Sequence, residues 1–537
     1  MIVKDSIQFQ KSASDRILIV LFLVAILAPA ALMPFTFMPG DNGLVEERRT
    51  RVPFPTVGVN SVSLATFPDE FEKYFNDRFG LRDLLVRGYS LLMWNVFHSS
   101  ISPKVVVGKD GWLFFNGDPA IGDSNPITDY RGTEPLEPHE LEWLRWMFDG
   151  QATWLGQNDM KFLLVILPSK TGIYPDYLPS AYTRTGAPRW REQFVSYLHK
   201  HTSVPVLDAG PSILRSRESD RVFMKSDTHW NDLGAYQTYL DIVAALASWF
   251  PEMDPTPISS YDILEREEDG GDLARLMHLD DVILEQQFRL VPRFALRSPN
   301  QPESDHPRAR VFGGTDDEDQ PTAYVYRDSF TANLIPLLSE RFRDVVYEWG
   351  QGGAKMKGIE ERKPDIVLQI VGDRILKAPL TYAPRMQRYA ARERFDRAAG
   401  NVLFSLSPDA GPVAPIRGCT VTEVEQGLKI IVTESGAQLQ LPPIPNIERV
   451  LPILRIDIRV PTYSALGILA ERSSGEARGR QDLIGLGREP LEQGRSTKYV
   501  SLVDPRATGP IVLDLGDATG SFGIYSLEIR GLPRYSD

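Results

Sequence analysis

KFLLVIL, residues 161–167, is the stretch of sequence that decides the fold. It is a continuous apolar run of strand length that ends at Pro168, which is typical of a strand buried on both faces of a parallel sheet. Comparable runs recur downstream at 204–208 (VPVLD), 322–326 (TAYVY), 345–349 (VVYEW) and 365–371 (DIVLQIV). Helical patterns separate several of them. This alternation predicts an α/β fold in which helices cover a layered parallel sheet.

The segments around these strands complete the predicted domain. Apolar residues at three- and four-residue spacing predict helices over residues 68–98, 138–157, 233–249 and 330–341. VVVGKDGWLFFNG at 105–117 predicts a β-hairpin that turns at Lys109-Asp110-Gly111. The charged segment 262–320 is expected to be a loop-rich insertion. Together these elements define one α/β domain over residues 67–390.

The character of the chain changes after about residue 400. Helical periodicity fades, and short alternating runs punctuated by Pro and Gly take its place, such as ILRIDIRV at 453–460 and PIVLDL at 510–515. Such spacing is typical of antiparallel strands packed as two sheets. We therefore expect residues 400–537 to form an all-β sandwich.

The N-terminus carries a strongly apolar segment. Residues 17–33, ILIVLFLVAILAPAALM, have no charge, and the apolar character continues to Met38. About 20 helical residues span the ~30 Å core of a bilayer. Three interpretations stay open: a retained signal anchor over 17–38 behind a cytoplasmic tail, a cleaved signal peptide, and a buried core helix. The anchor is favoured. Both the anchor and the signal peptide would place the rest of the chain on the outer side of the membrane, after an extended tether at 39–66.

Composition excludes several functions. The 537 residues carry 59 Lys and Arg against 71 Asp and Glu, a net charge of −12, which disfavours a nucleic-acid binder. Cys419 is the only cysteine, so neither an intramolecular disulfide nor a cysteine-based zinc site can form. No clustered carboxylates or HxxxH pattern indicates another metal site, and none is expected.

Two short motifs carry residues capable of acyl transfer. Asp227 and His229 lie two residues apart in SDTHWN, 226–231, where the carboxylate can orient the imidazole and stabilise its charged form. Ser329 follows the predicted strand that ends near Tyr326, where a strand-to-helix turn exposes a hydroxyl beside backbone N–H groups. Each motif alone is also compatible with an ordinary helix cap. If the three side chains meet at one sheet edge, they form a nucleophile, a base and an orienting acid.

Five motifs in a fixed order resemble one known family. They are FPDEFEKYFNDRFGLRDLLVRGY (67–89), VVVGKDGWLFF (105–115), VILPSKTGIYPDYLP (165–179), SDTHWN (226–231) and YRDSF (326–330). The series is similar to the periplasmic alginate O-acetyltransferase family of the AlgX/AlgJ type, which has an SGNH-hydrolase-like fold. The resemblance covers roughly residues 45–385, and it implies that Asp227 and His229 match the DxHW acid and base and that Ser329 matches the nucleophile. The chain order Asp, His, Ser is reversed relative to ordinary SGNH hydrolases, as in that family.

Four further residues are substrate-binding candidates. Lys170 and Tyr174 follow a strand end, within a PxKxxxYP stretch that the resemblance also includes. Arg327 stands where many relatives have a small residue, often Gly, so it is expected either to narrow the oxyanion pocket or to contact an anionic sugar. Arg374 follows the strand that ends at Val371, where it could pair with a uronate carboxylate or form a structural ion pair.

The resemblance implies an O-acetyltransferase that acetylates an alginate-like exopolysaccharide in the periplasm, anchored to the bacterial inner membrane. The triad would form an acetyl-serine without a cofactor, from an acetyl donor supplied by a membrane-bound O-acyltransferase. Other polysaccharide secretion components are expected partners, and the C-terminal sandwich resembles a carbohydrate-binding module. A polysaccharide acetylesterase with the same triad and a non-catalytic polysaccharide-binding assembly factor are the alternatives.

Overall fold

A computed structural model describes most of the chain. The described residues are 13–32, 52–55, 61–78, 82–118, 125–350, 356–377, 388–406, 412–445, 447, 450–472, 483–502 and 507–533. The α-helices are α1 (Ala13–Leu32), α3 (Ser61–Arg78), α4 (Arg82–Phe97), α5 (Pro126–Arg131), α6 (Pro138–Gln157), α7 (Lys170–Ile173), α8 (Trp190–His201), α9 (Gly210–Ser216), α10 (Asp232–Leu246), α11 (Asp272–Arg275), α12 (Ile335–Leu338), α13 (Met356–Arg362) and α15 (Arg388–Arg397).

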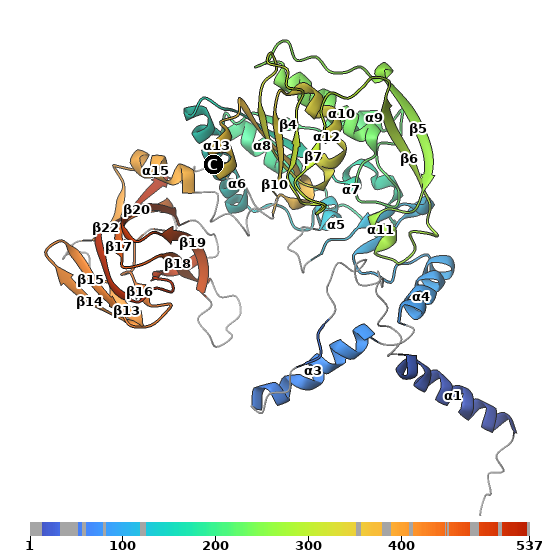
Figure 1. Cartoon of the computed structure of the whole chain (residues 1–537), viewed down its shortest axis with the longest axis horizontal. Helices are drawn as coiled ribbons and strands as arrows, with labels where there is room; N and C mark the ends of the chain where they lie inside the picture. Colours follow the sequence, from blue (N-terminus) through green and yellow to red (C-terminus); the bar gives the residue numbers. More distant parts are fainter. Residues whose placement is uncertain are drawn as a thin grey trace, which may run out of the picture.

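A seven-stranded sheet forms the centre of the α/β region (Figure 1). Its strand order is β4-β3-β11-β9-β10-β8-β7, and the first five strands are parallel to their neighbours. At the far edge, β8 is antiparallel to β10, and β7 is antiparallel to β8. The sheet is therefore mixed, and the prediction of a parallel sheet is wrong at this edge. The bounds are β3 (Lys161–Leu167), β4 (Val206–Asp208), β7 (Gln301–Pro302), β8 (Val311–Gly313), β9 (Ala323–Arg327), β10 (Val345–Trp349) and β11 (Ile366–Gly372).

The predicted burial of the strand at 161–167 is confirmed on both faces. Leu163 and Val165 pack with side chains of α10, whereas Leu164 and Ile166 pack with side chains of α6 and α8. Successive side chains of a strand point to opposite faces, so a run without polar residues requires cover on both sides. The sheet is the middle of three layers.

Segment 262–320 contains more regular structure than the expected insertion. Strands β5 (Tyr261–Glu268) and β6 (Glu285–Pro292) form an antiparallel hairpin, α11 lies in the connection between them, and β7 and β8 extend the central sheet. High charge concealed these strands, because most Glu and Arg residues of the hairpin are exposed or half-buried, whereas Glu285 is buried.

The hairpin predicted at 105–117 is present, and two predicted helices differ from expectation. β1 (Val105–Val107) pairs with β2 (Leu113–Phe115) around the predicted turn. The helix expected over 68–98 is instead α3 and α4, with 79–81 between them outside the described residues. The helix expected over 330–341 is divided into a 3₁₀ turn (Ser329–Asn333), α12 and a second 3₁₀ turn (Ser339–Arg341).

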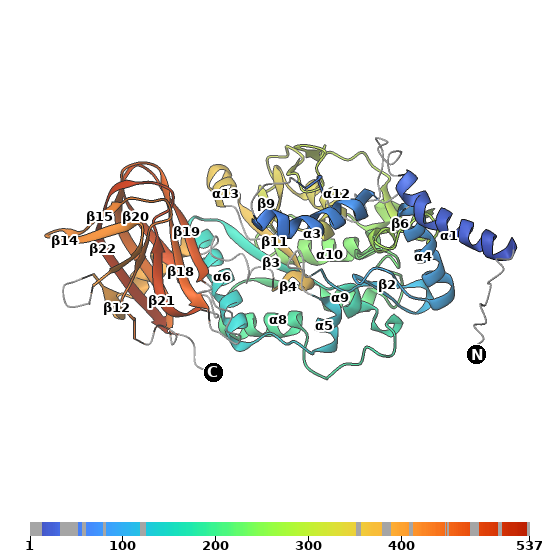
Figure 2. The same cartoon turned by 90° about the horizontal axis from the view of Figure 1, so that it is seen from below.

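The C-terminal region consists of two antiparallel sheets around their own apolar core, at one end of the molecule (Figures 1 and 2). One sheet has the order β14-β15-β22-β17-β20, with β12 paired to β22, and the other has the order β13-β16-β21-β18-β19. The strands are β12 (Val402–Ser405), β13 (Ala414–Arg417), β14 (Cys419–Val424), β15 (Gly427–Val432), β16 (Gln438–Gln440), β17 (Val450–Val460), β18 (Ser464–Arg472), β19 (Leu483–Leu491), β20 (Gly494–Ser501), β21 (Ala507–Asp514) and β22 (Gly520–Pro533).

The N-terminal segment forms helix α1, and its last predicted residues, 33–38, lie outside the described part. Among the residues that the structure describes, no helix combines the length and apolar character needed to cross a membrane. The anchor predicted over residues 17–38 stays a prediction.

Candidate active site

Asp328 fixes the turn that presents Ser329. One of its carboxylate oxygens accepts a hydrogen bond from the Phe330 N–H at 3.0 Å, and the other accepts from the Gly372 N–H at 3.0 Å. Gly372 is the last residue of β11, the neighbour of β9. The carboxylate thus ties together the carboxyl ends of two adjacent strands. Burial raises the pKa of Asp328, and the charge of Arg374 and both N–H donors oppose that effect.

The segment that carries His229 docks directly onto this turn. The indole N–H of Trp230 donates to the Phe330 carbonyl at 3.0 Å, and the His229 ring centroid lies 4.9 Å from that of Phe330. Asn231 then caps α10 by accepting hydrogen bonds from the backbone N–H groups of Leu233 and Gly234. A helix cap on one side and an indole bond on the other therefore set the position of the imidazole.

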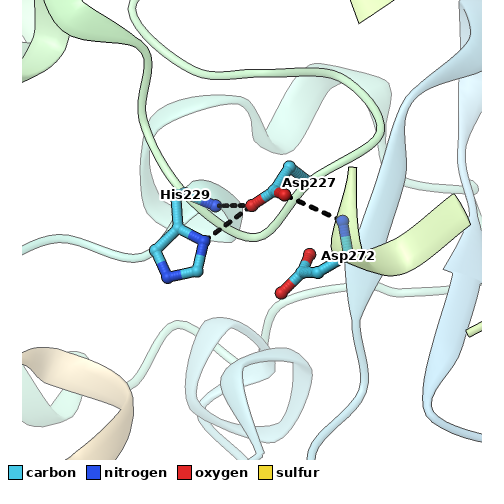
Figure 3. A group of neighbouring side chains, drawn as sticks. All are labelled: Asp227, His229 and Asp272. Atoms are coloured by element: carbon cyan, nitrogen blue, oxygen red, sulfur yellow. Dashed lines mark hydrogen bonds and ion pairs between the residues drawn. The ribbon is translucent and has the colours of Figure 1, made fainter. Parts of the chain in front are cut away.

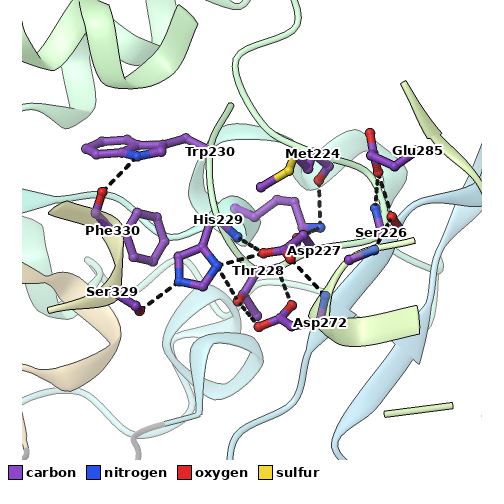
Figure 4. Close-up of polar contacts among 12 residues, drawn as sticks. Met224, Ser226, Asp227, Thr228, His229, Trp230, Asp272, Glu285, Ser329 and Phe330 are labelled. Atoms are coloured by element: carbon purple, nitrogen blue, oxygen red, sulfur yellow. Dashed lines mark hydrogen bonds and ion pairs between the residues drawn. The ribbon is translucent and has the colours of Figure 1, made fainter. Parts of the chain in front are cut away.

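The structure brings the three predicted side chains into one hydrogen-bonded chain (Figure 4). Ser329 Oγ lies 2.7 Å from His229 Nε2, and His229 Nδ1 lies 2.6 Å from Asp227 Oδ1. An ionised carboxylate can only accept, so Nδ1 carries a proton and Nε2 of the neutral ring faces the serine hydroxyl as an acceptor. This is the geometry expected of a nucleophile, a general base and an orienting acid.

The charges of the pair favour this protonation pattern. Burial alone would raise the pKa of Asp227, but the charge and hydrogen bond of His229 and the N–H of Asp272 hold it well below its ordinary value. Burial alone would lower the pKa of His229, but the Asp227 carboxylate outweighs it, and that pKa lies above its ordinary value. The pair is therefore built to stabilise an imidazolium once it forms.

Two further acids support the triad, and neither was predicted from the sequence. The Asp272 N–H donates to Asp227 Oδ2 at 2.8 Å (Figure 3), and its carboxylate accepts from the N–H and the hydroxyl of Thr228 at 2.7 and 2.6 Å. The Glu285 carboxylate accepts from both the N–H and the hydroxyl of Ser226, each at 2.7 Å (Figure 4). Both acids come from segment 262–320. No local motif in that segment indicates that it contributes to the site.

Asp227, His229 and Asp272 could together supply three metal ligands. Their hydrogen bonds argue against that role. Asp227 Oδ1 faces His229 Nδ1, Asp227 Oδ2 accepts from a backbone N–H, and both Asp272 oxygens accept from Thr228. Because every one of these atoms already serves a partner, the donor set fits a hydrogen-bonded triad better than a cation site.

Lys170 and Tyr174 are buried against the segment that carries Asp227 and His229 and do not lie at the protein surface. The Lys170 side chain is buried and its ammonium donates to the backbone carbonyls of Met224, Lys225 and Asp227. Tyr174 is also buried, and its hydroxyl accepts from the Val222 N–H at 3.0 Å. Burial raises the pKa of Tyr174. Both residues therefore support the loop that holds His229.

Arg327 and Arg374 have different surroundings. Arg327 points away from the triad: it donates to the carbonyls of Pro307 and Ala309 at 3.3 and 3.0 Å and stacks over Trp349. Burial lowers its pKa. The guanidinium of Arg374 instead lies 5.5 and 5.6 Å from the ring centroids of Phe115 and Phe330, the latter in contact with His229. Of the two arginines, the structure brings Arg374 to the site.

The fold and these distances define a class: a layered α/β domain with a Ser-His-Asp arrangement at the carboxyl edge of its sheet. Residues 105–362 match the family model described as SGNH hydrolase-like domain, acetyltransferase AlgX. This region of the chain is similar to that family, and the predicted resemblance is confirmed over these residues.

Individual relatives and solved structures are similar to parts of this chain. The chain is 24% identical over 268 residues to the probable alginate O-acetylase AlgJ of Pseudomonas aeruginosa, covering 49% of this chain and 64% of that protein, somewhat less than two thirds of its length. PatB1 of Bacillus cereus matches at 16% identity and a TM-score of 0.39, over 51% of this chain and 96% of that one. The O-acetyltransferase domain of Pseudomonas putida AlgJ matches at 18% identity and a TM-score of 0.37, over 54% of this chain and 99% of that one.

Proposed function

We propose that this protein is an O-acetyltransferase that acetylates hydroxyl groups of an alginate-like exopolysaccharide through an acetyl-Ser329 intermediate. The observation that carries the proposal is the continuous hydrogen-bonded chain from Ser329 Oγ through the His229 ring to Asp227, at 2.7 and 2.6 Å. A relative named as a probable alginate O-acetylase supports the choice of acyl group and polymer.

The reaction proceeds in two half-reactions. Ser329 Oγ attacks the acetyl carbonyl of the donor while its proton passes to His229 Nε2, and the donor's leaving group departs with that proton. A sugar hydroxyl then gives its proton to the same nitrogen and attacks the acetyl-serine, which returns a protonated Ser329. Asp227 stabilises the imidazolium in both steps. The Phe330 N–H is engaged by Asp328, so oxyanion stabilisation falls to other backbone N–H groups of the turn.

Arg374 is the proposed contact for the acidic acceptor. Its Nε is buried without a hydrogen-bond partner among the described residues, and its guanidinium stacks between Phe115 and Phe330. A planar guanidinium held by two aromatic rings presents its remaining N–H groups as a fork that suits a uronate carboxylate. The substrate class that follows is a polymer of uronic acids.

We expect the reaction to take place in the periplasm, as the resemblance implies, with a membrane-bound O-acyltransferase as the acetyl supplier and other secretion components as partners. The C-terminal sandwich is the proposed polymer-binding module. A polysaccharide acetylesterase would use the same acetyl-serine, with water in place of the sugar hydroxyl.

The deciding experiment incubates the protein with p-nitrophenyl acetate and uronate oligosaccharides and follows the products by mass spectrometry. The expected result is an acetylated oligosaccharide, and no product with the Ser329→Ala variant, whose fold is checked by circular dichroism. Release of free acetate without acetylated sugar would identify an esterase. Sugar binding without any acetylation of Ser329 would identify a non-catalytic binding protein.

A further inference from the structure

The buried ammonium of Lys170 is bonded to the segment that carries two triad residues. Lys170 opens α7, directly after β3, and its side chain is 4% exposed. Its Nζ donates to the carbonyl oxygens of Met224, Lys225 and Asp227 at 3.0, 2.9 and 2.5 Å. The third acceptor is the main chain of the residue that orients His229.

The Lys225 carbonyl also accepts the backbone N–H of Leu113 at 2.9 Å, so it keeps one donor without Lys170. Residues 224–229 lie between two bridge residues, Phe223 and Trp230, and form no helix or strand of their own. Buried carbonyl groups need donors, and an irregular segment cannot supply them by a regular ladder. An ammonium group has three N–H donors, so Lys170 matches the three carbonyls one to one.

We propose that Lys170 is a positioning residue. Its ammonium acts as a clamp that holds the Asp227–His229 segment where His229 Nε2 is within hydrogen-bond distance of Ser329. The inference rests on the proposed function, since it assigns Lys170 a part in the same acyl transfer. It differs from a substrate-binding role because all three N–H donors point into the protein.

The charges around Lys170 make the clamp sensitive to pH. Burial lowers the pKa of Lys170 to about 8, although the carboxylates of Asp227, Glu285 and Asp272 favour the charged form, while Arg221 opposes it. Its nonpolar neighbours are the rings of Trp112 and Phe114, 5.7 and 5.5 Å from Nζ. Loss of one proton leaves two donors for three carbonyls, so the clamp weakens as pH rises through this range.

The test measures acetylation of Ser329 by p-nitrophenyl acetate between pH 6 and 10, on the full chain. Lys170→Met is expected to lower kcat about 10²-fold with KM unchanged, because a displacement of about 1 Å in a catalytic group costs that much. Wild-type activity is expected to decline above about pH 8, and this decline should be absent in Lys170→Met. The matched control is Lys225→Met, which removes an ammonium from the same loop whose own bond goes to the Asp110 carbonyl.

Lys170→Gln covers the case in which the methionine variant does not fold. It keeps two N–H donors and does not titrate, so we expect an intermediate kcat and again no alkaline decline. A Lys170 variant whose kcat is within twofold of the wild-type value, or one that keeps the alkaline decline, would overturn the clamp. Absence of any Ser329 acetylation in the wild type would instead overturn the proposed function, so the two failures are distinguishable.

Discussion

The two nitrogens of His229 have unlike partners, a carboxylate at Nδ1 and a hydroxyl at Nε2. The carboxylate fixes the tautomer, so Nε2 is the nitrogen that accepts the serine proton and later returns a proton. Asp227 in turn is held by the backbone N–H groups of His229 and Asp272. At the scale of single residues, function depends on which atoms donate and which accept.

Activity is expected to rise with pH as His229 loses its proton, because catalysis requires the neutral ring. The midpoint should lie above 6.5, the ordinary pKa of histidine, since Asp227 outweighs burial. Asp227→Asn removes that charge, so the midpoint should move to lower pH, and the plateau rate should fall about 10³–10⁴-fold because an amide can favour the wrong tautomer. The rate of Ser329 acetylation against pH measures both effects, and a midpoint left in place by the substitution would contradict this account.

Arg374→Gln is expected to raise KM for uronate oligosaccharides about tenfold, equivalent to ~1.4 kcal/mol, while KM for neutral oligosaccharides stays unchanged. The reason is the loss of the guanidinium held between Phe115 and Phe330. Steady-state kinetics with matched acidic and neutral acceptors provide the measurement. An equal change for both acceptors would argue for a structural role.

At the scale of elements, the connection between β5 and β6 acts as a wall behind the triad. Gly270 and Gly271 precede α11, and a Cβ placed on Gly271 would collide with the side chain and main chain of Asp227. Only a residue without a side chain permits this close approach. The wall therefore fixes the orientation of Asp227 from the side opposite His229.

Gly271→Ala is expected to displace Asp227 and reduce Ser329 acetylation at least about tenfold, because triad geometry tolerates little movement. The matched control is Gly156→Ala in α6, where an added Cβ has no neighbour within 4 Å. That control should raise the free energy of unfolding by about 0.5–1 kcal/mol and leave acetylation unchanged. Equal activities of the two variants would show that the wall plays no part.

Much of the fold and the three central residues could be predicted from the sequence. Continuous apolar runs marked the parallel strands, and two short motifs marked Asp227, His229 and Ser329. Asp272 and Glu285 could not be predicted, because they act through tertiary contacts made by a charged hairpin with an exposed face. The burial of Lys170 could not be predicted, since a strand end alone does not tell whether a side chain lies at the surface or inside the protein.

At the scale of the whole molecule, α15 connects the α/β region to the sandwich. It contacts α6 on one side and β17, β20 and β22 on the other. Phe395 is buried at this junction, with its ring centroid 5.5 Å from that of Tyr499 and the Arg530 guanidinium 4.0 Å above it. The junction is a packed apolar contact.

Phe395→Ala is expected to destabilise the junction by about 3–5 kcal/mol, the usual cost of removing a large buried ring. Urea unfolding followed by tryptophan fluorescence measures the change. Tyr463→Ala, at a side chain that is 71% exposed, is the control and should alter stability by less than about 0.5 kcal/mol. A loss similar to that of the control would show that α15 is not packed as described.

His229 and Ser329 lie 100 positions apart in the chain, on a loop and at a strand end that are brought together only by the assembled sheet. In a growing or partly folded polypeptide the Ser329 hydroxyl and the His229 imidazole are therefore apart, so the serine is not activated and does not consume acyl donors. Under the proposed function, acetylation of Ser329 therefore serves as a measure of folding, because it requires the assembled sheet.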